Sequence, residues 1–220
     1  MLKPREIRKV LNILALHYGN TGTALHFQTP FQLLVATIMA AQSTDKQVNN
    51  ITRRLFAEHP DPASLLKLSV QELEGKIKQV GLYRNKARHI LAAARMIMEE
   101  FGGEVPRSRR ELMKLPGVGR KTANVVLSVG FQHDAIAVDT HVFRVANRIG
   151  LADADDPLST EQQLMANIPR KQWSAAHHWL IWHGRKICRA QNPRCQSCPL
   201  TDYCEFFRNR SPKSATPSDG

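Results

Sequence analysis

Apolar residues recur at helical spacing along most of this chain. The clearest stripe, with the three-four stagger of one buried helix face, is formed by Ile90, Leu91, Ala94, Ile97, Met98 and Phe101. The alternation that marks strands is nearly absent, and its best candidate, residues 135–138, is too short to found a sheet. The pattern predicts an all-α protein of about ten helices joined by short loops.

Capping signals mark where these helices begin and end. Thr29 precedes Pro30 with Gln32 three residues on, which combines an N-cap, a first-turn proline and a capping box. Further starts are predicted at Asp61-Pro62, Ser69, Ser108 and Ser159. Glycines that close an apolar-periodic stretch predict stops at Gly19, Gly81, Gly102-Gly103 and Gly150. The segment 211–220, rich in Ser and Pro, is expected to be disordered.

The chain carries a large excess of positive charge. Its 220 residues include 31 Lys and Arg against 19 Asp and Glu, for a formal net charge of +12. A polyanionic partner is the natural inference, and its binding should weaken steeply with salt. The competing interpretation is a surface that is charged only for solubility.

The distribution of this charge indicates which surface would meet the polyanion. Residues 149–169 contain no Lys or Arg, so this acidic segment should face away from the partner. Residues 185–210 contain six basic and two acidic residues, a net charge of +4, and should lie on the binding side.

Nothing in the chain predicts a membrane segment. The longest apolar run, residues 31–41, is about half the length that spans a bilayer and is interrupted by Gln32. We also see no cleavable signal sequence. We therefore expect a cytoplasmic protein with no membrane partner and with an ordinary globular core.

All four cysteines fall within one window of seventeen residues, with the spacing C-x6-C-x2-C-x5-C. They are Cys188, Cys195, Cys198 and Cys204. Four thiolates on a short loop make a tetradentate site for a metal ion or a cluster. Zinc ribbons usually carry two C-x2-C pairs and this window has one, so the spacing favours a [4Fe–4S] cluster over zinc. Two disulfides are the third interpretation, which a reducing cytosol disfavours.

Basic side chains surround these cysteines. A buried inorganic core would hold the loop rigid and present the positive charge of Arg185, Lys186, Arg189 and Arg194. The histidines His141, His177, His178 and His183 show no metal-binding pair on one helix face, so packing or phosphate contact is expected for them.

A second motif, LPGVGRKTA at residues 115–123, predicts a tight turn followed by a helix. Pro116 and Gly117 set the turn, and Gly119 lets the backbone approach a ligand closely. Amide groups at such a turn, backed by the positive end of a helix, suit a phosphate. Lys121 lies in the first helical turn, where the dipole favours the neutral amine, a nucleophile that can form a Schiff base. The alternative is a phosphate-binding or solvated lysine.

Asp139 lies in the segment AVDTHVF, directly before a predicted helix that runs to residue 147 or 148. It is a good N-cap for that helix. It could also place a carboxylate beside the Lys121 amine, stabilise positive charge on a sugar and move protons. The two roles are compatible, because a cap can present its second oxygen to a cleft.

Together these motifs resemble the endonuclease III family, the bifunctional DNA glycosylases and abasic-site lyases of the helix-hairpin-helix superfamily. The resemblance extends from about residue 5 to residue 207. It rests on the cysteine loop, LPGVGRKTANVVL and AVDTHVFRVANR, with FQLLVATIMAAQSTD, VGLYRNKA and HHWLIWHGRKIC in the family order.

The resemblance implies a role for each matching position. Lys121 corresponds to the lysine nucleophile, Asp139 to the essential aspartate and the four cysteines to the cluster ligands. Gln42 corresponds to the residue that enters the gap left by an extruded nucleotide, and Leu82 to the wedge beside it. Each of these two has a plainer alternative, a polar helix end for Gln42 and a core position for Leu82. The hairpin that holds a phosphate corresponds to Leu115, Pro116, Gly117, Val118 and Gly119, followed by Arg120.

The resemblance also implies an architecture and a partner. We expect a helix-hairpin-helix glycosylase fold whose two helical domains flank a cleft, with a C-terminal [4Fe–4S] loop. The expected domains are a six-helix barrel at 23–133 and an iron–sulfur domain formed by 1–22 and 134–210. The expected partner is duplex DNA that contains damaged, chiefly oxidised, pyrimidines or abasic sites, bound by a monomer at the bacterial nucleoid.

Three other functions remain to be distinguished from this one. An adenine-mismatch glycosylase of the superfamily lacks the lysine and carries a further C-terminal domain. This chain has Lys121, and we expect no such further domain. A non-enzymatic DNA-binding module would bind in a salt-sensitive way without forming an imine. An electron-transfer protein would have an acidic or neutral docking face and no phosphate hairpin.

Overall fold

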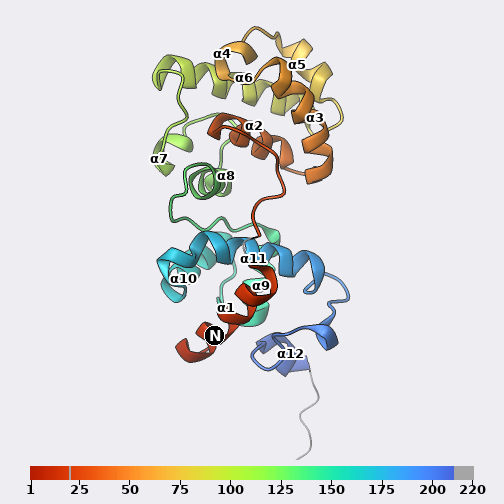
Figure 1. Ribbon diagram of the computed structural model, residues 1–220, viewed down its shortest axis with the longest axis vertical. Coiled ribbons are helices and arrows are strands. Elements are labelled where there is room, and N and C mark those ends of the chain that lie inside the picture. Colours follow the sequence, from red (N-terminus) through yellow and green to blue (C-terminus); the bar gives the residue numbers. More distant parts are fainter. Residues whose placement is uncertain (20, 211–220) are drawn as a thin grey trace, which may run out of the picture. The chain divides into compact units, whose positions relative to one another are not determined.

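The computed structural model describes residues 1–19 and 21–210, and every regular element in them is a helix (Figure 1). The all-α prediction is confirmed. These residues form twelve α-helices where the pattern predicted about ten, and two of the twelve are single turns of four residues. The predicted disordered tail, 211–220, lies outside the described residues. Within the described ranges, no helix is long and apolar enough to cross a membrane.

The chain divides into two compact units. Unit 1 consists of the described parts of Met1–Thr21 and Val138–Gly220, and unit 2 is Gly22–Ala137. The domains expected from the sequence divide the chain after residues 22 and 133, whereas the units divide it after residues 21 and 137.

Unit 2 is built around one almost fully buried helix, α2 (Pro30–Ala40). Every residue from Phe31 to Met39 is buried, because α2 packs against three other helices, α3 (Asp45–Glu58), α6 (Tyr83–Glu100) and α8 (Arg120–Val125). The last of these continues as a π-helical turn, η1 (Val126–Gly130). The short helices α4 (Pro62–Leu65) and α5 (Val70–Ile77) pack on α6, and α7 (Arg109–Leu112) packs on α8.

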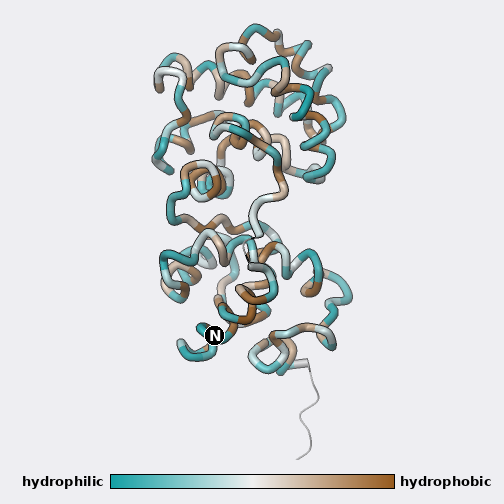
Figure 2. The backbone as a smooth tube through the Cα atoms, viewed as in Figure 1, coloured by the Kyte–Doolittle hydropathy of each residue, from teal (hydrophilic) through white to brown (hydrophobic). Residues whose placement is uncertain are grey.

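Unit 1 is centred on α11 (Trp173–Lys186), which packs on α1 (Pro4–Tyr18) and α9 (Thr140–Ile149). Gly184 lets α11 pack tightly on α9, since a Cβ there would lie 3.0 Å from Cγ2 of Val145. The remaining elements are α10 (Pro157–Asn167), the 3-10 turns η2 (Arg170–Gln172) and η3 (Cys195–Ser197), and α12 (Glu205–Arg210). Hydrophobic and hydrophilic stretches alternate along these helices, as amphipathic packing requires (Figure 2).

Most of the predicted helix boundaries are confirmed. The side chains of Thr29, Asp61, Ser69 and Ser108 each accept a hydrogen bond from the backbone N–H three residues on. Gly150 ends α9 with φ +98°, in the left-handed region that glycine occupies readily.

The predicted helix start at Ser159 is wrong. Asp156 caps α10 instead, because its Oδ1 accepts hydrogen bonds from the backbone N–H groups of Leu158 and Ser159. Pro157 then occupies the first helical position, which suits its fixed φ and missing N–H. Ser159 is therefore already in the first turn, where its hydroxyl donates back to Asp156.

Candidate functional site

The predicted hairpin forms in unit 2 between α7 and α8. Gly117 adopts φ +79°, and a Cβ on it would lie 2.9 Å from Cβ of His89 on α6. Glycine is therefore required there by both conformation and space. Gly119 is the N-cap of α8, in extended backbone with open space around it. The side chains of Leu115 and Val118 are buried, which anchors the turn, whereas the backbone of Gly117 and Gly119 is exposed.

Lys121 is the second residue of α8, in the first turn as predicted. Its side chain is exposed, and it makes no hydrogen bond or ion pair with any described residue. An amine in this position is accessible to a substrate that approaches the hairpin.

Gln42 and Leu82 are forty residues apart in sequence but lie close together in unit 2. A Cβ on Gly81 would lie only 3.0 Å from the carbonyl oxygen of Gln42, and the Gly81 N–H donates to Oγ of Ser43 at 3.2 Å. Both residues adopt left-handed backbone, with φ +56° for Gln42 and +57° for Leu82. Such conformations are strained for residues with side chains and cluster at functional sites.

Leu82 is also exposed, with 59% of its surface accessible, so its alternative as a core residue is wrong. The plainer alternative for Gln42, an exposed polar residue just after a helix, agrees with its position beyond the end of α2.

Asp139 caps α9 in unit 1, as predicted. Its Oδ1 accepts a hydrogen bond from the N–H of Val142 at 2.8 Å, and the residue is half-buried. Lys121 belongs to unit 2 and Asp139 to unit 1. The cap accounts for one carboxylate oxygen.

The four cysteines line one cavity in unit 1. Its other walls are largely apolar, with Ile149, Ile187, Leu200, Phe206 and Phe207 among them. All four sulfurs are free thiols, so the disulfide interpretation is wrong. Burial raises the pKa of Cys198 to about 11 and also raises that of Cys204. Thiolates in this setting need a neighbouring cationic centre, which is the chemistry that a metal cluster supplies.

Two arginines on α9 hold the backbone of the cysteine loop. Arg144 donates from Nε and Nη2 to the carbonyl oxygen of Cys188, at 3.2 and 3.1 Å. Arg148 donates to the carbonyl oxygens of Arg189 and Ala190, at 2.7 and 3.0 Å, and its guanidinium lies over the ring of Phe206.

His183 approaches the cavity from α11. It is buried, its Nε2 lies 3.6 Å from Sγ of Cys198, and its Nδ1 lies 3.0 Å from the hydroxyl of Tyr18. Burial lowers the pKa of His183 to about 4 and raises that of Tyr18 to about 12, so both groups are neutral. Once bound to a cluster, Cys198 is a thiolate and can only accept a hydrogen bond, so Nε2 would donate to it and Nδ1 would accept from Tyr18.

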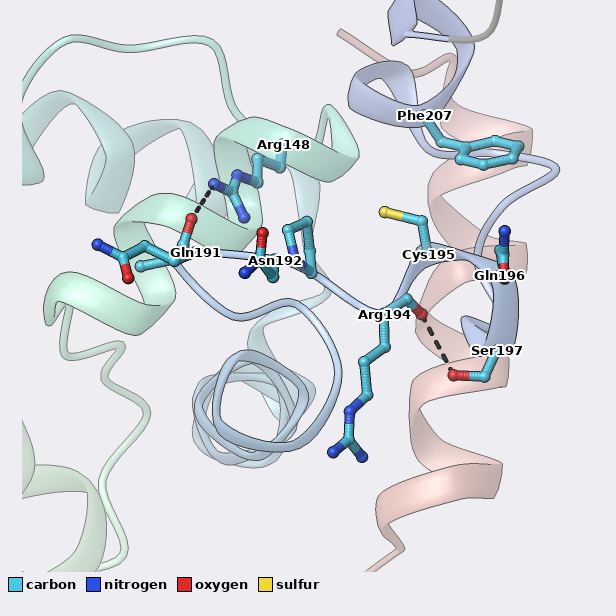
Figure 3. A pocket seen from close by; sticks show the side chains of 10 residues that line it. Arg148, Gln191, Asn192, Arg194, Cys195, Gln196, Ser197 and Phe207 are labelled. Carbon is cyan, nitrogen blue, oxygen red and sulfur yellow. Dashed lines mark hydrogen bonds between the residues drawn. The ribbon is translucent and has the colours of Figure 1, made fainter.

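The basic side chains of the loop are on the surface. Arg185, Lys186, Arg189 and Arg194 are all exposed. Arg185 and Lys186 both contact the Trp182 ring, at 5.5 and 5.3 Å from its centroid. A groove of about 1090 Å³ lies along the cysteine loop and is lined by Arg148, Arg194 and Cys195 among others. Figure 3 shows the side chains that line it. Trp182 is half-buried and so is less of a core residue than Trp173 and Trp179.

Comparison with known proteins identifies the family. The profile of the HhH-GPD superfamily base excision DNA repair proteins matches residues 35–170. The profile of the iron–sulfur binding domain of endonuclease III matches residues 188–204, which begin at Cys188 and end at Cys204. Endonuclease III of Bacillus subtilis (strain 168) is 46% identical over 214 residues, which cover 97% of this chain and 98% of that protein. The chain belongs to the endonuclease III family.

Further comparisons agree with this family. Endonuclease III of Escherichia coli (strain K12) is 46% identical over 198 residues, covering 90% of this chain and 94% of that protein. The solved structure of a trapped endonuclease III–DNA covalent intermediate matches with a TM-score of 0.91 and 47% identity, covering 96% of this chain and 99% of that chain. As a member of this family, the chain is a base excision repair enzyme, a DNA glycosylase with abasic-site lyase activity, and its cofactor is a [4Fe–4S] cluster rather than zinc.

Four residues shape the site without having been assigned that role from the sequence, although His183 was expected to make packing or phosphate contacts. Arg144 and Arg148 are four residues apart, and this spacing on a predicted helix could have indicated a shared basic face. No local signal distinguishes His183 from the other histidines, or the buried Lys86 from the other lysines, because both are defined by contacts with distant segments.

Proposed function

We propose that this protein removes oxidised or otherwise damaged pyrimidines from duplex DNA and then cuts the strand at the abasic site through a Schiff base on Lys121. The exposed, unpaired amine at the start of α8, directly after a glycine hairpin, is the observation that carries the proposal. A structure with 47% sequence identity is a trapped covalent intermediate of an endonuclease III with DNA, which supports a covalent step here.

Binding to the duplex would use phosphate contacts first. The hairpin of residues 115–119 would hold one phosphate near the lesion through the backbone N–H groups of Gly117 and Gly119, together with the side chain of Arg120. Pro116 has no N–H, and those of Leu115 and Val118 already donate to carbonyl oxygens of the turn. The exposed Arg185, Lys186, Arg189 and Arg194 would contact the backbone elsewhere. We propose that Leu82 and Gln42 fill the space from which the damaged nucleotide is turned out, a step that is easier for poorly stacked bases.

Chemistry would follow in two steps. The Lys121 nitrogen forms a bond to the anomeric carbon of the sugar while the bond to the base breaks, and the base leaves with that electron pair and takes up a proton. Loss of the proton on the nitrogen and opening of the sugar ring give an imine. The imine acidifies the adjacent carbon, and loss of a proton there expels the 3′ phosphate by β-elimination. The second oxygen of Asp139 would stabilise the developing positive charge and relay protons.

The thiolates of Cys188, Cys195, Cys198 and Cys204 would hold the [4Fe–4S] cluster. When it is bound, its contribution is structural, since it ties the basic loop into one fold. We further propose that the protein acts as a monomer, in the cytoplasm at the bacterial nucleoid, and has no membrane partner.

Borohydride trapping tests the proposal. The protein is mixed with a duplex that contains one abasic site, reduced with borohydride, digested and analysed by mass spectrometry. The expected adduct is on Lys121 and is absent in Lys121→Gln, while Lys67→Gln, which changes an exposed lysine elsewhere in unit 2, retains it. Strand cleavage by Lys121→Gln at the parent rate would overturn the assignment.

A further inference from the structure

Lys86 is a buried lysine whose side-chain hydrogen bonds all go to one distant segment. It is 5% exposed, and its Nζ donates to the carbonyl oxygen of Met39 at 2.8 Å, to that of Ala41, and to Oγ of Ser43 at 3.5 Å. It forms no ion pair with any described residue. Burial of an ammonium without a counter-charge is costly, and the three oxygens offset this cost.

The contacted segment is the C-terminal end of α2 and the turn that follows it. The last carbonyl groups of a helix have no partner within the helix, and a cation there also interacts favourably with the negative end of the helix dipole. Lys86 meets both needs at the point where the chain leaves α2. The next residue after Ala41 is Gln42, which turns into left-handed backbone and is exposed.

The backbone of Lys86 is tied to the second strained residue. Its N–H donates to the carbonyl oxygen of Leu82 at 3.1 Å, in the first turn of α6. Leu82 is the N-cap of this helix but has no side-chain cap. Ser43 completes the connection, because its Oγ contacts Nζ of Lys86 and accepts from the N–H of Gly81. One residue thus braces both left-handed positions, through its backbone on one side and its side chain on the other.

We infer that Lys86 is a positioning residue that holds Gln42 and Leu82 together as one preformed wedge for the duplex. This inference rests on the roles given to Gln42 and Leu82 in the proposed function. Left-handed backbone is unfavourable for both residues, so without the brace each would relax to other conformations and would have to be ordered again during insertion. Lys86 would then act on the extrusion of the nucleotide and not on the chemistry at Lys121.

The test measures insertion separately from catalysis. The DNA is a duplex with 2-aminopurine beside a tetrahydrofuran abasic analogue, which has no aldehyde and cannot form an imine. Stopped-flow fluorescence follows the unstacking of 2-aminopurine as the wedge enters. Lys86→Met, which keeps the length and removes the donors, should slow this phase roughly ten- to hundredfold, the range expected for a misplaced contact group. Lys67→Met is the matched control and should retain the parent rate.

A double-mutant cycle distinguishes positioning from general destabilisation. In a Leu82→Ala background, Lys86→Met should cause little further slowing, because the wedge through which it acts is gone. Full additivity of the two changes would overturn the inference while leaving the wedge role of Leu82 intact. If Leu82→Ala itself inserts at the parent rate, the wedge assignment fails and the inference fails with it, while Lys121 trapping remains unaffected.

A second variant keeps the test decisive if Lys86→Met does not fold. Ser43→Ala removes only the hydroxyl that joins Lys86 to Gly81, at a half-buried position. It should slow insertion in the parent and not in the Leu82→Ala background. Equal slowing in both backgrounds would count against the brace.

Discussion

The guanidinium of Arg148 donates a hydrogen bond to the carbonyl oxygen of Arg189 at 2.7 Å. This contact joins α9 to the residue that follows the first cysteine of the cluster loop. The same side chain reaches Ala190 and lies near Sγ of Cys188, at 3.7 Å. The loop is therefore held at its start by a helix forty residues earlier in the sequence.

Loss of this contact should loosen the cluster. Arg148→Met keeps an unbranched apolar side chain near Phe206 but removes the guanidinium and leaves two carbonyl groups without their donor, a loss of about 1–3 kcal/mol for hydrogen bonds to a charged group. We expect a lower iron content per chain after dialysis against a chelator and a lower melting temperature. Arg8→Met, on the exposed side of α1, should change neither. An iron content equal to the parent's would contradict this role.

The two roles of Asp139 can be separated by one substitution. Asparagine caps helices nearly as well as aspartate, so Asp139→Asn should keep the free energy of unfolding within about 0.5 kcal/mol. It should nevertheless lower single-turnover release of a damaged base by at least about a hundredfold, because the carboxylate charge is lost. Full turnover in Asp139→Asn would mean that the residue only caps α9.

The hairpin should not tolerate a side chain at Gly117. Gly117→Ala places a Cβ 2.9 Å from His89 on backbone with φ +79°, which we expect to cost about 1–3 kcal/mol and to weaken binding to an undamaged duplex. Gly75→Ala is the matched control. It lies within α5 with open space around it, so it should raise the melting temperature slightly or leave it unchanged. Equal stability of the two variants would contradict this account of the hairpin.

Stability should fall as the pH drops below about 6.5. Burial lowers the pKa of His178 from its ordinary value of 6.5, while its Nδ1 donates to the carbonyl oxygen of Ser174 at 2.8 Å. In this window the unfolded chain takes up a proton that the folded chain does not. The contribution of His178 is thus complete above the ordinary pKa and is lost at up to about 1.4 kcal/mol per pH unit as the pH falls toward the folded value.

Urea unfolding at several pH values checks this slope. His178→Asn retains a donor for Ser174 but no longer titrates, so its free energy of unfolding should change less between pH 6.5 and 5 than that of the parent. Above pH 7.5 the free energy of unfolding should depend on pH in the same way for both proteins. Identical slopes below pH 6.5 would rule out His178 as a contributor.

Local signals in the sequence were reliable because the physics behind them acts over one helical turn. A hydroxyl or carboxylate satisfies the N–H three residues on, which is why the starts at Thr29, Asp61, Ser69 and Ser108 were predicted correctly. The helix start was wrongly predicted at Ser159 because several local signals competed there. Asp156 is the better N-cap for α10, and Pro157 is the better first residue of that helix. The four-cysteine spacing likewise needs only a short loop to be informative.

The sequence by itself determined the helical class, the cysteine site, the glycine hairpin before Lys121 and the resemblance to a repair family. Only the tertiary structure decided that Gln42 and Leu82 lie close together on the surface and that Lys86 connects them. It also decided that Arg148 and His183 support the cysteines. Most of these contacts join segments about forty residues apart, as between Lys86 and Met39 or between Arg148 and Arg189. His183 and Cys198 are fifteen residues apart. Such pairs carry no mark in the local sequence, because they form only when separate helices pack and bury the groups that need each other.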